Sequence, residues 1–161
     1  MANDRTTPEE NLRRALASAP CFQGLTPLML EEVATCARRA DFESGAFILR
    51  EGRPAQEFYV IERGRVAIEL RSTNRGQIVI QTLEAGDVVG FSWLYPPQRW
   101  LFDAQALTGV QTLAIDAPKL LSICDKDPQM GYTVTRRLIE GVVDRLQAMR
   151  LQLLDFYGVV G

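Results

Sequence analysis

The feature that most constrains this sequence is a central stretch, residues 46–115, in which short β-forming runs alternate with glycines. The runs are rich in Val, Ile, Leu and Phe, and the glycines fall at or near the breaks, as expected for strands joined by tight turns. The candidate strands are 47–49, 58–61, 66–70, 78–83, 88–89 and 111–115. About seven short strands with turns this close together predict a small antiparallel barrel, roll or sandwich.

Helix-start signals flank this stretch on both sides. Each combines a side chain that can accept a hydrogen bond from the first helical turn with a proline at one of the first helical positions. Glu10 completes a capping box at the first of them. The four starts are Thr7-Pro8, Thr26-Pro27, Asp116 with Pro118, and Asp127-Pro128. The third helix is expected to be short and to end at about Ile123.

The last predicted helix, residues 128–157, is the most regular segment of the chain. Apolar or small side chains follow one another at alternating spacings of three and four, which is a heptad seam. This row consists of Tyr132, Thr135, Ile139, Val142, Leu146, Met149, Leu153 and Phe156, and a second row consists of Val134, Leu138, Val143, Leu151 and Leu154. At about 1.5 Å per residue the helix would reach about 45 Å, longer than a small barrel can cover.

Such a helix is expected to pack on its own barrel at one end and on a second copy of the chain elsewhere. The residues predicted at that dimer interface are Ile139, Val142, Leu146, Met149, Leu153 and Phe156. The alternative is a helix that lies wholly within one domain.

Composition excludes several classes of function. With 18 Lys and Arg against 20 Asp and Glu, the net charge of −2 gives no general attraction to nucleic acid or anionic membranes. The absence of His removes imidazole-based catalysis and His-ligated zinc. Cys21, Cys36 and Cys124 form no CxxC motif, which favours reduced thiols in a cytoplasmic protein. No metal site, catalytic constellation, signal peptide or membrane span is expected, so the protein is predicted not to be an enzyme.

The segment 86–107 holds the candidates for a ligand site. Gly90 ends a very short strand and permits a sharp turn, so residues 91–94 are expected to form a helical turn whose free N–H groups suit an anion. Arg99 follows and can bind a phosphate through two hydrogen bonds. Asp103 would serve either as a cap or as a partner of Arg99.

Three aromatic side chains, Phe91, Trp93 and Trp100, crowd this segment. They would either line an apolar pocket or fill the interior of the barrel, and composition favours filling.

Three pieces of the sequence resemble a known family. They are AFILREGRPAQEFYVIERGRVAIEL, then IVIQTLEAGDVVG after a hairpin at Asn74-Arg75-Gly76, and finally DPQMGYTVTRRLIEGVVDRL. Together they resemble the cyclic nucleotide-binding domain of bacterial catabolite-activator and FNR-type regulators, over roughly residues 20–157. The matched positions include Gly52, the Tyr59-x-Ile61-x-x-Gly64-x-Val66 run and Gly86-Asp87-x-x-Gly90.

The resemblance implies a mainly β fold with flanking helices. An antiparallel β-roll of the jelly-roll type, at about 41–115, would be followed by a long dimerisation helix at about 128–157. The expected division is an N-terminal helical extension, 1–19, and a cyclic nucleotide-binding-like domain, 20–161. The chain ends at Gly161, where the winged helix-turn-helix of the regulators would begin, so it is not expected to bind DNA alone.

The residues that hold the ligand in this family match less well. Phe91 stands where the family has a Glu for the ribose, and the Arg and small residue that clamp the phosphate fall near Trp100-Leu101 unless a shorter loop brings Arg99 into place. A hydroxyl pair that reaches adenine falls on Gly141 and Val142, whereas Arg137 matches a helix Arg near the phosphate.

The predicted function is therefore a stand-alone sensor module that binds a cyclic nucleotide or another small effector atypically and signals through its dimer helix, with a protein effector as a further partner. The predicted ligand-binding residues are Gly90, Phe91, Ser92, Trp93, Arg99, Trp100, Arg137, Gly141 and Val142. The alternative is a ligand-independent scaffold dimer whose pocket is filled by its own aromatic side chains.

Overall fold

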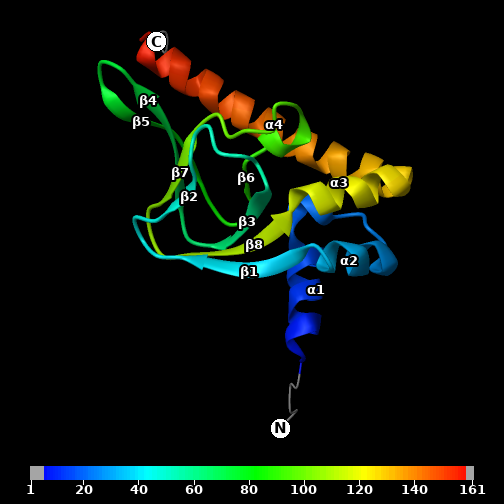
Figure 1. The fold of residues 1–161 in the computed structure, drawn as a ribbon. Helices are drawn as coiled ribbons and strands as arrows, with labels where there is room; N and C mark the ends of the chain where they lie inside the picture. Colours follow the sequence, from blue (N-terminus) through cyan, green and yellow to red (C-terminus); the bar gives the residue numbers. More distant parts are fainter. Residues whose placement is uncertain (1–5, 159–161) are drawn as a thin grey trace.

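Two four-stranded antiparallel sheets face each other in the computed structural model, which describes residues 6–158 (Figure 1). The strands are β1 (Ala37–Phe42), β2 (Phe47–Leu49), β3 (Glu57–Arg63), β4 (Val66–Ser72), β5 (Gly76–Leu83), β6 (Val88–Val89), β7 (Asp103–Ala106) and β8 (Val110–Asp116). One sheet has the order β1-β8-β3-β6 and the other β2-β7-β4-β5. Strands of both sheets contribute fully buried side chains, among them Phe58, Ile61, Leu113 and Ile68, so the predicted antiparallel β-roll is confirmed.

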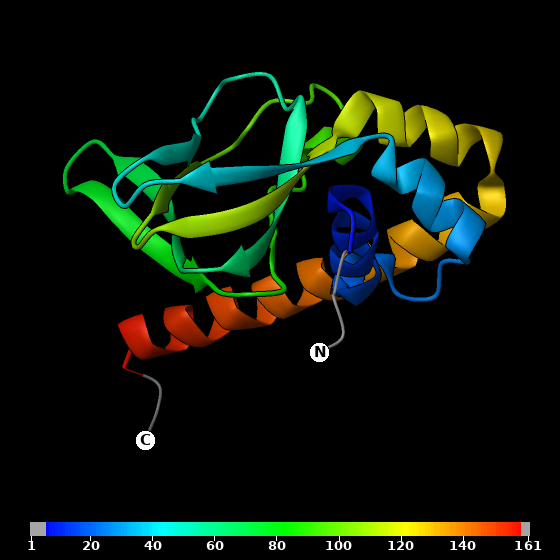
Figure 2. The same cartoon turned by 90° about the horizontal axis from the view of Figure 1, so that it is seen from below.

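Helices gather at one end of the roll. They are α1 (Pro8–Ser18), α2 (Pro27–Ala34), α3 (Ala117–Lys126) and α4 (Pro128–Phe156), with single 3-10 turns η1 (Pro20–Phe22) and η2 (Ser92–Leu94). Seen from below, α4 runs from this helical end along the roll (Figure 2). Its last turns lie beside the β4–β5 hairpin, where the Arg75 guanidinium is 5.9 Å from the centre of the Phe156 ring.

All four predicted helix starts are confirmed. Thr7 and Glu10 form the expected capping box, and the side chains of Thr26, Asp116 and Asp127 each accept a hydrogen bond from a backbone N–H of the first turn. The third helix, α3, continues to Lys126, three residues beyond the expected end. In α1, Leu16 is fully buried, so this helix contributes to the core that η1 and α2 also enclose.

Two strands, β1 and β7, were not predicted from the sequence. The sequence of β1 is Ala-Arg-Arg-Ala-Asp-Phe and that of β7 is Asp-Ala-Gln-Ala. β-Branched and aromatic side chains, which mark a strand, are lacking in β7 and are represented in β1 by its last residue, Phe42, alone. Both strands are held by their neighbours, because β1 pairs along its whole length with β8 and β7 lies between β2 and β4. The roll therefore begins at Ala37 rather than near residue 41.

The helix α4 has two different apolar faces. Its inner stripe, which we define as Met130, Val134, Leu138 and Arg145, is buried against the rest of the chain. Its outer stripe, which we define as Tyr132, Ile139, Val142, Leu146, Leu153 and Phe156, ranges from 40% exposed at Val142 to 69% at Phe156. Met149, predicted beside them, is half-buried. Among residues 6–158, no helix is both long and apolar enough to cross a membrane.

Candidate functional site

The chain between β6 and β7 is folded around two buried tryptophans. Gly90 has a φ of +93°, and a Cβ there would lie 2.3 Å from the Trp100 ring, so only glycine lets the ring lie against the backbone. The indole N–H of Trp93 donates to the carbonyl of Gly90 at 3.1 Å, and its ring stacks on Phe58 with 4.3 Å between centroids. The expected helical turn is confirmed as η2, in which Ser92 is buried as well. Trp93 and Trp100 thus belong to the core.

Arg99 is turned away from this interior. Its Nη1 donates to the carbonyl of Gly52 at 2.8 Å, and its backbone forms an isolated bridge with Pro54. The carboxylate of Asp103 accepts from the backbone N–H of Glu51 at 2.8 Å and from Gln77 at 2.8 Å. These two bonds connect β7 to the turn after β2 and to β5, so among the described residues Asp103 is seen neither as a helix cap nor as a partner of Arg99.

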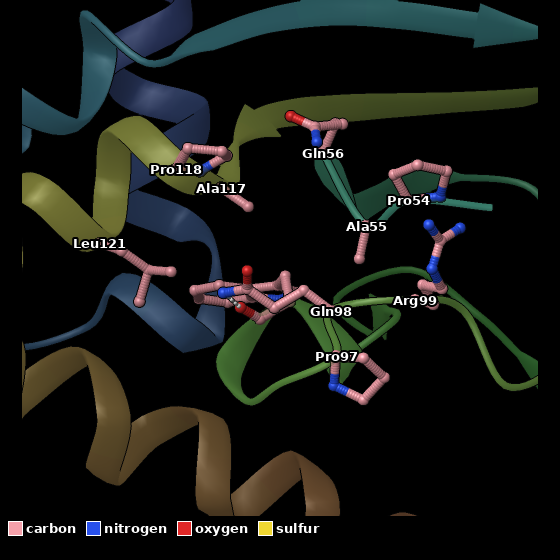
Figure 3. Close-up of a pocket in the computed structure, with 10 residues that line it drawn as sticks. Pro54, Ala55, Gln56, Pro97, Gln98, Arg99, Ala117, Pro118 and Leu121 are labelled. Carbon is pink, nitrogen blue, oxygen red and sulfur yellow. Dashed lines mark hydrogen bonds between the residues drawn. The ribbon is translucent and has the colours of Figure 1, made fainter. Parts of the chain in front are cut away.

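A first cavity of about 320 Å³ lies on this side of the roll, against the start of α3 (Figure 3). We call it the α3 cavity. Trp93 and Arg99 line it together with proline, alanine, glutamine and leucine side chains, namely Pro54, Ala55, Gln56, Pro97, Gln98, Ala117, Pro118 and Leu121. The guanidinium of Arg99 is the one charged group in this lining, and its Nη1 is already bonded to Gly52.

A second cavity, of about 240 Å³, lies between the roll and α4. We call it the α4 cavity. The roll supplies Gln81 and Leu83 of β5, the turn from Ala85 to Val88, and Phe91, whereas α4 supplies Arg137, Leu138, Glu140, Gly141, Asp144 and Arg145. Pro20 and Cys21 of η1 complete the lining. An occupant of this cavity would touch the sheet and the long helix at once.

Phe91 lines the α4 cavity and packs against the long helix. A Cβ on Gly141 would lie 3.3 Å from the tip of its ring, so the ring packs directly on the helix where the helix has no side chain. The guanidinium carbon of Arg145 lies 4.7 Å from the centre of the same ring and 6.0 Å from that of Phe102. Both distances are within the range of cation–π attraction.

Arg145 is the most deeply placed charge of this cavity. It is 9% exposed, and its Nη2 donates to the carbonyl of Val88 in β6. Burial lowers the pKa of Arg145 to about 10, and the negative charge of Asp87 offsets part of that effect. Arg137, in contrast, is at the rim, where its Nε donates to the carbonyl of Gln23 and its Nη1 lies 3.4 Å from Glu140.

The cysteine at the edge of the cavity is a buried thiol. Burial raises the pKa of Cys21 to about 12, and burial also raises the pKa of Cys124 to about 11 and that of Cys36. All three are free thiols, and they are protonated at neutral pH. Within residues 6–158 no group of three or more His, Cys, Asp or Glu side chains could hold a metal ion.

The structure divides the predicted ligand residues among four places. Phe91, Arg137 and Gly141 line the α4 cavity, and Gly90 directly precedes Phe91. Trp93 and Arg99 line the α3 cavity, Ser92 and Trp100 are buried, and Val142 lies on the outer stripe of α4. The predicted ligand residues did not include Gln81, Asp87 or Arg145, which also line the α4 cavity. A signal for Arg145 was available, because it falls seven residues after Leu138 on an otherwise apolar stripe.

Comparisons place the fold among known proteins. The sequence model of the family described as cyclic nucleotide-binding domain matches residues 39–127. No curated protein matches this chain in sequence.

Several solved structures share the fold. A Geobacter metallireducens protein described as cyclic nucleotide-binding has 21% identity and a TM-score of 0.74, over 87% of this chain and 98% of that one. The sensor domain of the transcriptional regulator DNR from Pseudomonas aeruginosa has 18% identity and a TM-score of 0.71, over 86% of this chain and 93% of that one. The guanosine-bound regulatory subunit of a cAMP-independent protein kinase A from Trypanosoma cruzi has 20% identity and a TM-score of 0.71, over 94% of this chain and 50% of that one.

Proposed function

We propose that this chain, which belongs to the cyclic nucleotide-binding domain family, is a regulatory module that binds a small ligand in the α4 cavity and transmits binding through α4. The observation that carries the proposal is the composition of the cavity, whose walls come from the roll on one side and from α4 on the other. A ligand that contacts both walls can favour one position of the helix over another, which is the physical requirement for signalling.

The ligand is proposed to differ from ordinary cAMP. Phe91 offers no acceptor for a ribose hydroxyl, and Arg99 is bonded to the Gly52 carbonyl outside the α4 cavity. Losing several polar contacts at once should weaken cAMP binding by orders of magnitude. The guanosine-bound kinase subunit supports the idea that this fold accepts ligands other than cyclic nucleotides.

Thermal unfolding in the presence of a ligand panel tests the function. The panel holds cAMP, cGMP, cyclic dinucleotides, nucleosides, nucleoside monophosphates and small aromatic metabolites. We expect at least one compound to raise the melting temperature while cAMP at the same concentration has little effect, because stabilisation follows the ratio of ligand concentration to Kd. A panel without any stabilising compound counts against a sensor, and strong stabilisation by cAMP counts against an atypical ligand.

The outer stripe of α4 is proposed to pair with the outer stripe of a second copy of the chain. Six large apolar or aromatic side chains are exposed there at heptad spacing, an arrangement that favours helix pairing. The proposed signalling route then runs from the cavity through the inner stripe to the outer stripe, and from the dimer to a protein effector. We propose no catalytic activity and no DNA binding for this chain, and we propose that it acts in the cytoplasm.

A second candidate is a ligand-independent scaffold dimer, and the packing of Phe91 favours it. The ring packs on α4 at Gly141 and lies under the guanidinium of Arg145, so the chain's own aromatic group takes up space beside the α4 cavity. Phe91→Glu separates the two candidates. A scaffold should lose a few kcal/mol of stability and still bind its protein partner without added ligand. A variant that keeps its stability and gains cAMP binding shows that the ring was not a structural plug.

A further inference from the structure

Arg145 occupies a position of α4 where the helix otherwise buries hydrocarbon. The inner stripe passes through Met130, Val134 and Leu138, all at most 2% exposed, and Arg145 continues it at helical spacing. An arginine is rarely buried to this extent unless it is paired. A group of opposite charge beside Arg145 is therefore expected.

Asp87 acts on Arg145 through its charge, but the part of the chain that the structure describes supplies no direct ion pair for Arg145. The ion pairs within residues 6–158 involve Arg13, Arg38, Arg39 and Arg137, and none involves Arg145. Its recorded contacts are a carbonyl at Nη2 and two aromatic faces. The guanidinium has lost its water without gaining a counter-ion, an arrangement that folding alone does not favour.

Two unpaired polar atoms point to the same cavity. Three buried side-chain polar atoms lack a hydrogen-bond partner within the described residues, and two of them, Nε of Arg145 and Oε1 of Gln81, belong to residues that line the α4 cavity. One is a donor on the helix wall and the other is an acceptor on the β5 wall. Buried polar atoms are nearly always paired, so a pair of opposite type across one cavity indicates a missing molecule.

We propose that Arg145 is the recognition residue for an oxyanion in the α4 cavity, so that the ligand presents a phosphate or carboxylate group to Nε of Arg145 and an N–H or O–H group to Oε1 of Gln81. The inference rests on the proposed function and adds the chemistry of its ligand. A guanidinium edge that carries Nε–H matches two oxygens of either anion.

The carboxylates around the α4 cavity lie at its exposed rim, so they repel an oxyanion beside Arg145 only weakly. Asp87, Glu140 and Asp144 are all exposed, Asp87 accepts a hydrogen bond from the backbone N–H of Glu84, and Glu140 lies beside Arg137. Charges in contact with solvent are screened, whereas the buried charge of Arg145 acts at close to full strength on an atom beside it. The floor of the cavity is therefore positive although its rim is acidic.

The position of Arg145 also connects recognition to the helix. Its Nη2 already joins α4 to β6 through the Val88 carbonyl. An oxyanion bound to the neighbouring Nε would contact the same guanidinium that holds α4 to the roll. Ligand binding would therefore change the strength of the contact between α4 and β6.

Matched ligand pairs test the inference, with binding measured by titration calorimetry and by the melting temperature. The pairs are AMP with adenosine, GMP with guanosine, and benzoate with benzyl alcohol, so that the first two report a phosphate and the third a carboxylate. Arg145→Met removes the charge at similar volume, and Arg145→Gln serves as a second variant. Arg63→Met is the control, because Arg63 is exposed on β3 and its loss changes the net charge by the same amount.

In at least one pair, the anionic member should bind the wild-type protein at least about tenfold more tightly than its neutral twin. That preference should vanish in Arg145→Met and Arg145→Gln and persist in Arg63→Met. A preference that survives both Arg145 substitutions overturns the inference. Neutral twins that bind as tightly as the anions also overturn it, while leaving the proposed function intact. Failure of every compound to bind the wild-type protein rejects the inference together with the proposed function.

Discussion

Arg145 and Leu138 lie on the same buried stripe of α4, but their contributions to stability should be opposite in kind. Leu138→Ala removes packed hydrocarbon and should lower the free energy of unfolding by about 2–5 kcal/mol. Arg145→Met should change it by no more than about 1 kcal/mol, because relief of the desolvated charge offsets the lost hydrogen bond to Val88. Urea unfolding of the ligand-free proteins measures both. A loss of several kcal/mol in Arg145→Met would show that the charge is structural.

Glu69 is a second buried charge, on β4, and it should make stability depend on pH. Burial and the neighbouring Asp103 raise the pKa of Glu69, while Arg50 lowers it in part, and Oε2 of Glu69 has no partner. A raised folded-state pKa gives stability that is present below the pKa of the unfolded chain and lost as the pH rises through the folded-state value. Glu69→Gln should therefore stabilise the protein at pH 7 by about 1 kcal/mol, the lower end of the cost of burying an unpaired polar atom.

The gain from Glu69→Gln should shrink toward zero below about pH 4, where the carboxyl is protonated in both states. Unfolding free energies from pH 3.5 to pH 8 report this, with Glu43→Gln as a control at an exposed position. A gain that is the same at every pH would exclude titration of Glu69 as its cause.

The sequence predicted some cavity residues and not others for a physical reason. Phe91, Arg137 and Gly141 were found because motif positions place them in order along the chain. Arg145 was missed because its burial depends on Val88 and Phe91, which lie more than fifty residues away in sequence. The same holds for Gln81, which lines the α4 cavity because β5 faces α4 at this point.

Among the elements, the turn after β6 should tolerate substitution poorly. Gly90→Ala places a methyl group 2.3 Å from the Trp100 ring at a φ of +93°, so steric overlap adds to backbone strain. We expect a loss of about 3 kcal/mol or more, measured by urea unfolding. Gly45→Ala is the matched control, since its φ is +89° and a Cβ there would meet nothing within 4 Å. It should lose only about 1–2 kcal/mol, and equal losses at both positions would mean that Trp100 moves aside freely.

Helices were more predictable than strands because their signals are local. A cap such as Thr7 with Glu10 is complete within four residues, so the sequence alone specifies where α1 begins. A polar strand such as β1 has no comparable signal, and its pairing partner β8 lies about seventy residues further along the chain. Hydrogen bonds to β8 determine the conformation of β1, and a short segment of the sequence around β1 carries no information about them.

At the scale of the whole molecule, assembly should depend on the outer stripe of α4. Leu146→Glu would bring two carboxylates together at the centre of a paired helix face, where Leu146 is 63% exposed in the single chain. Sedimentation velocity should give twice the 18.0 kDa of one chain for the wild type. In Leu146→Glu the dimer Kd should rise at least about a hundredfold, equivalent to about 2.7 kcal/mol.

Gln147→Glu is the control for the assembly prediction, because it adds the same charge one residue away from the outer stripe. It should remain dimeric, and both variants should keep the wild-type circular dichroism spectrum. A wild-type protein that sediments as a single chain at micromolar concentration would contradict the assembly prediction.

The architecture of the whole molecule was predictable because glycine-punctuated strands, helix caps and family motifs all favour the same roll. The distribution of the aromatic side chains between the core and the α4 cavity was not predictable from the sequence. Three aromatic residues within ten positions of one another lie in different places, with Trp93 and Trp100 in the core and Phe91 against α4.

The two stripes of α4 belong to one stiff rod, and this has a mechanical consequence. A helix of about 10 Å diameter that turns by about 10° about its own axis carries the side chains on its far side through an arc of about 1 Å. Interlocked side chains tolerate little displacement of that size before they change partners. A ligand that fits the α4 cavity could thus weaken or strengthen a contact on the opposite side of α4 by rotating the helix, without bending the helix.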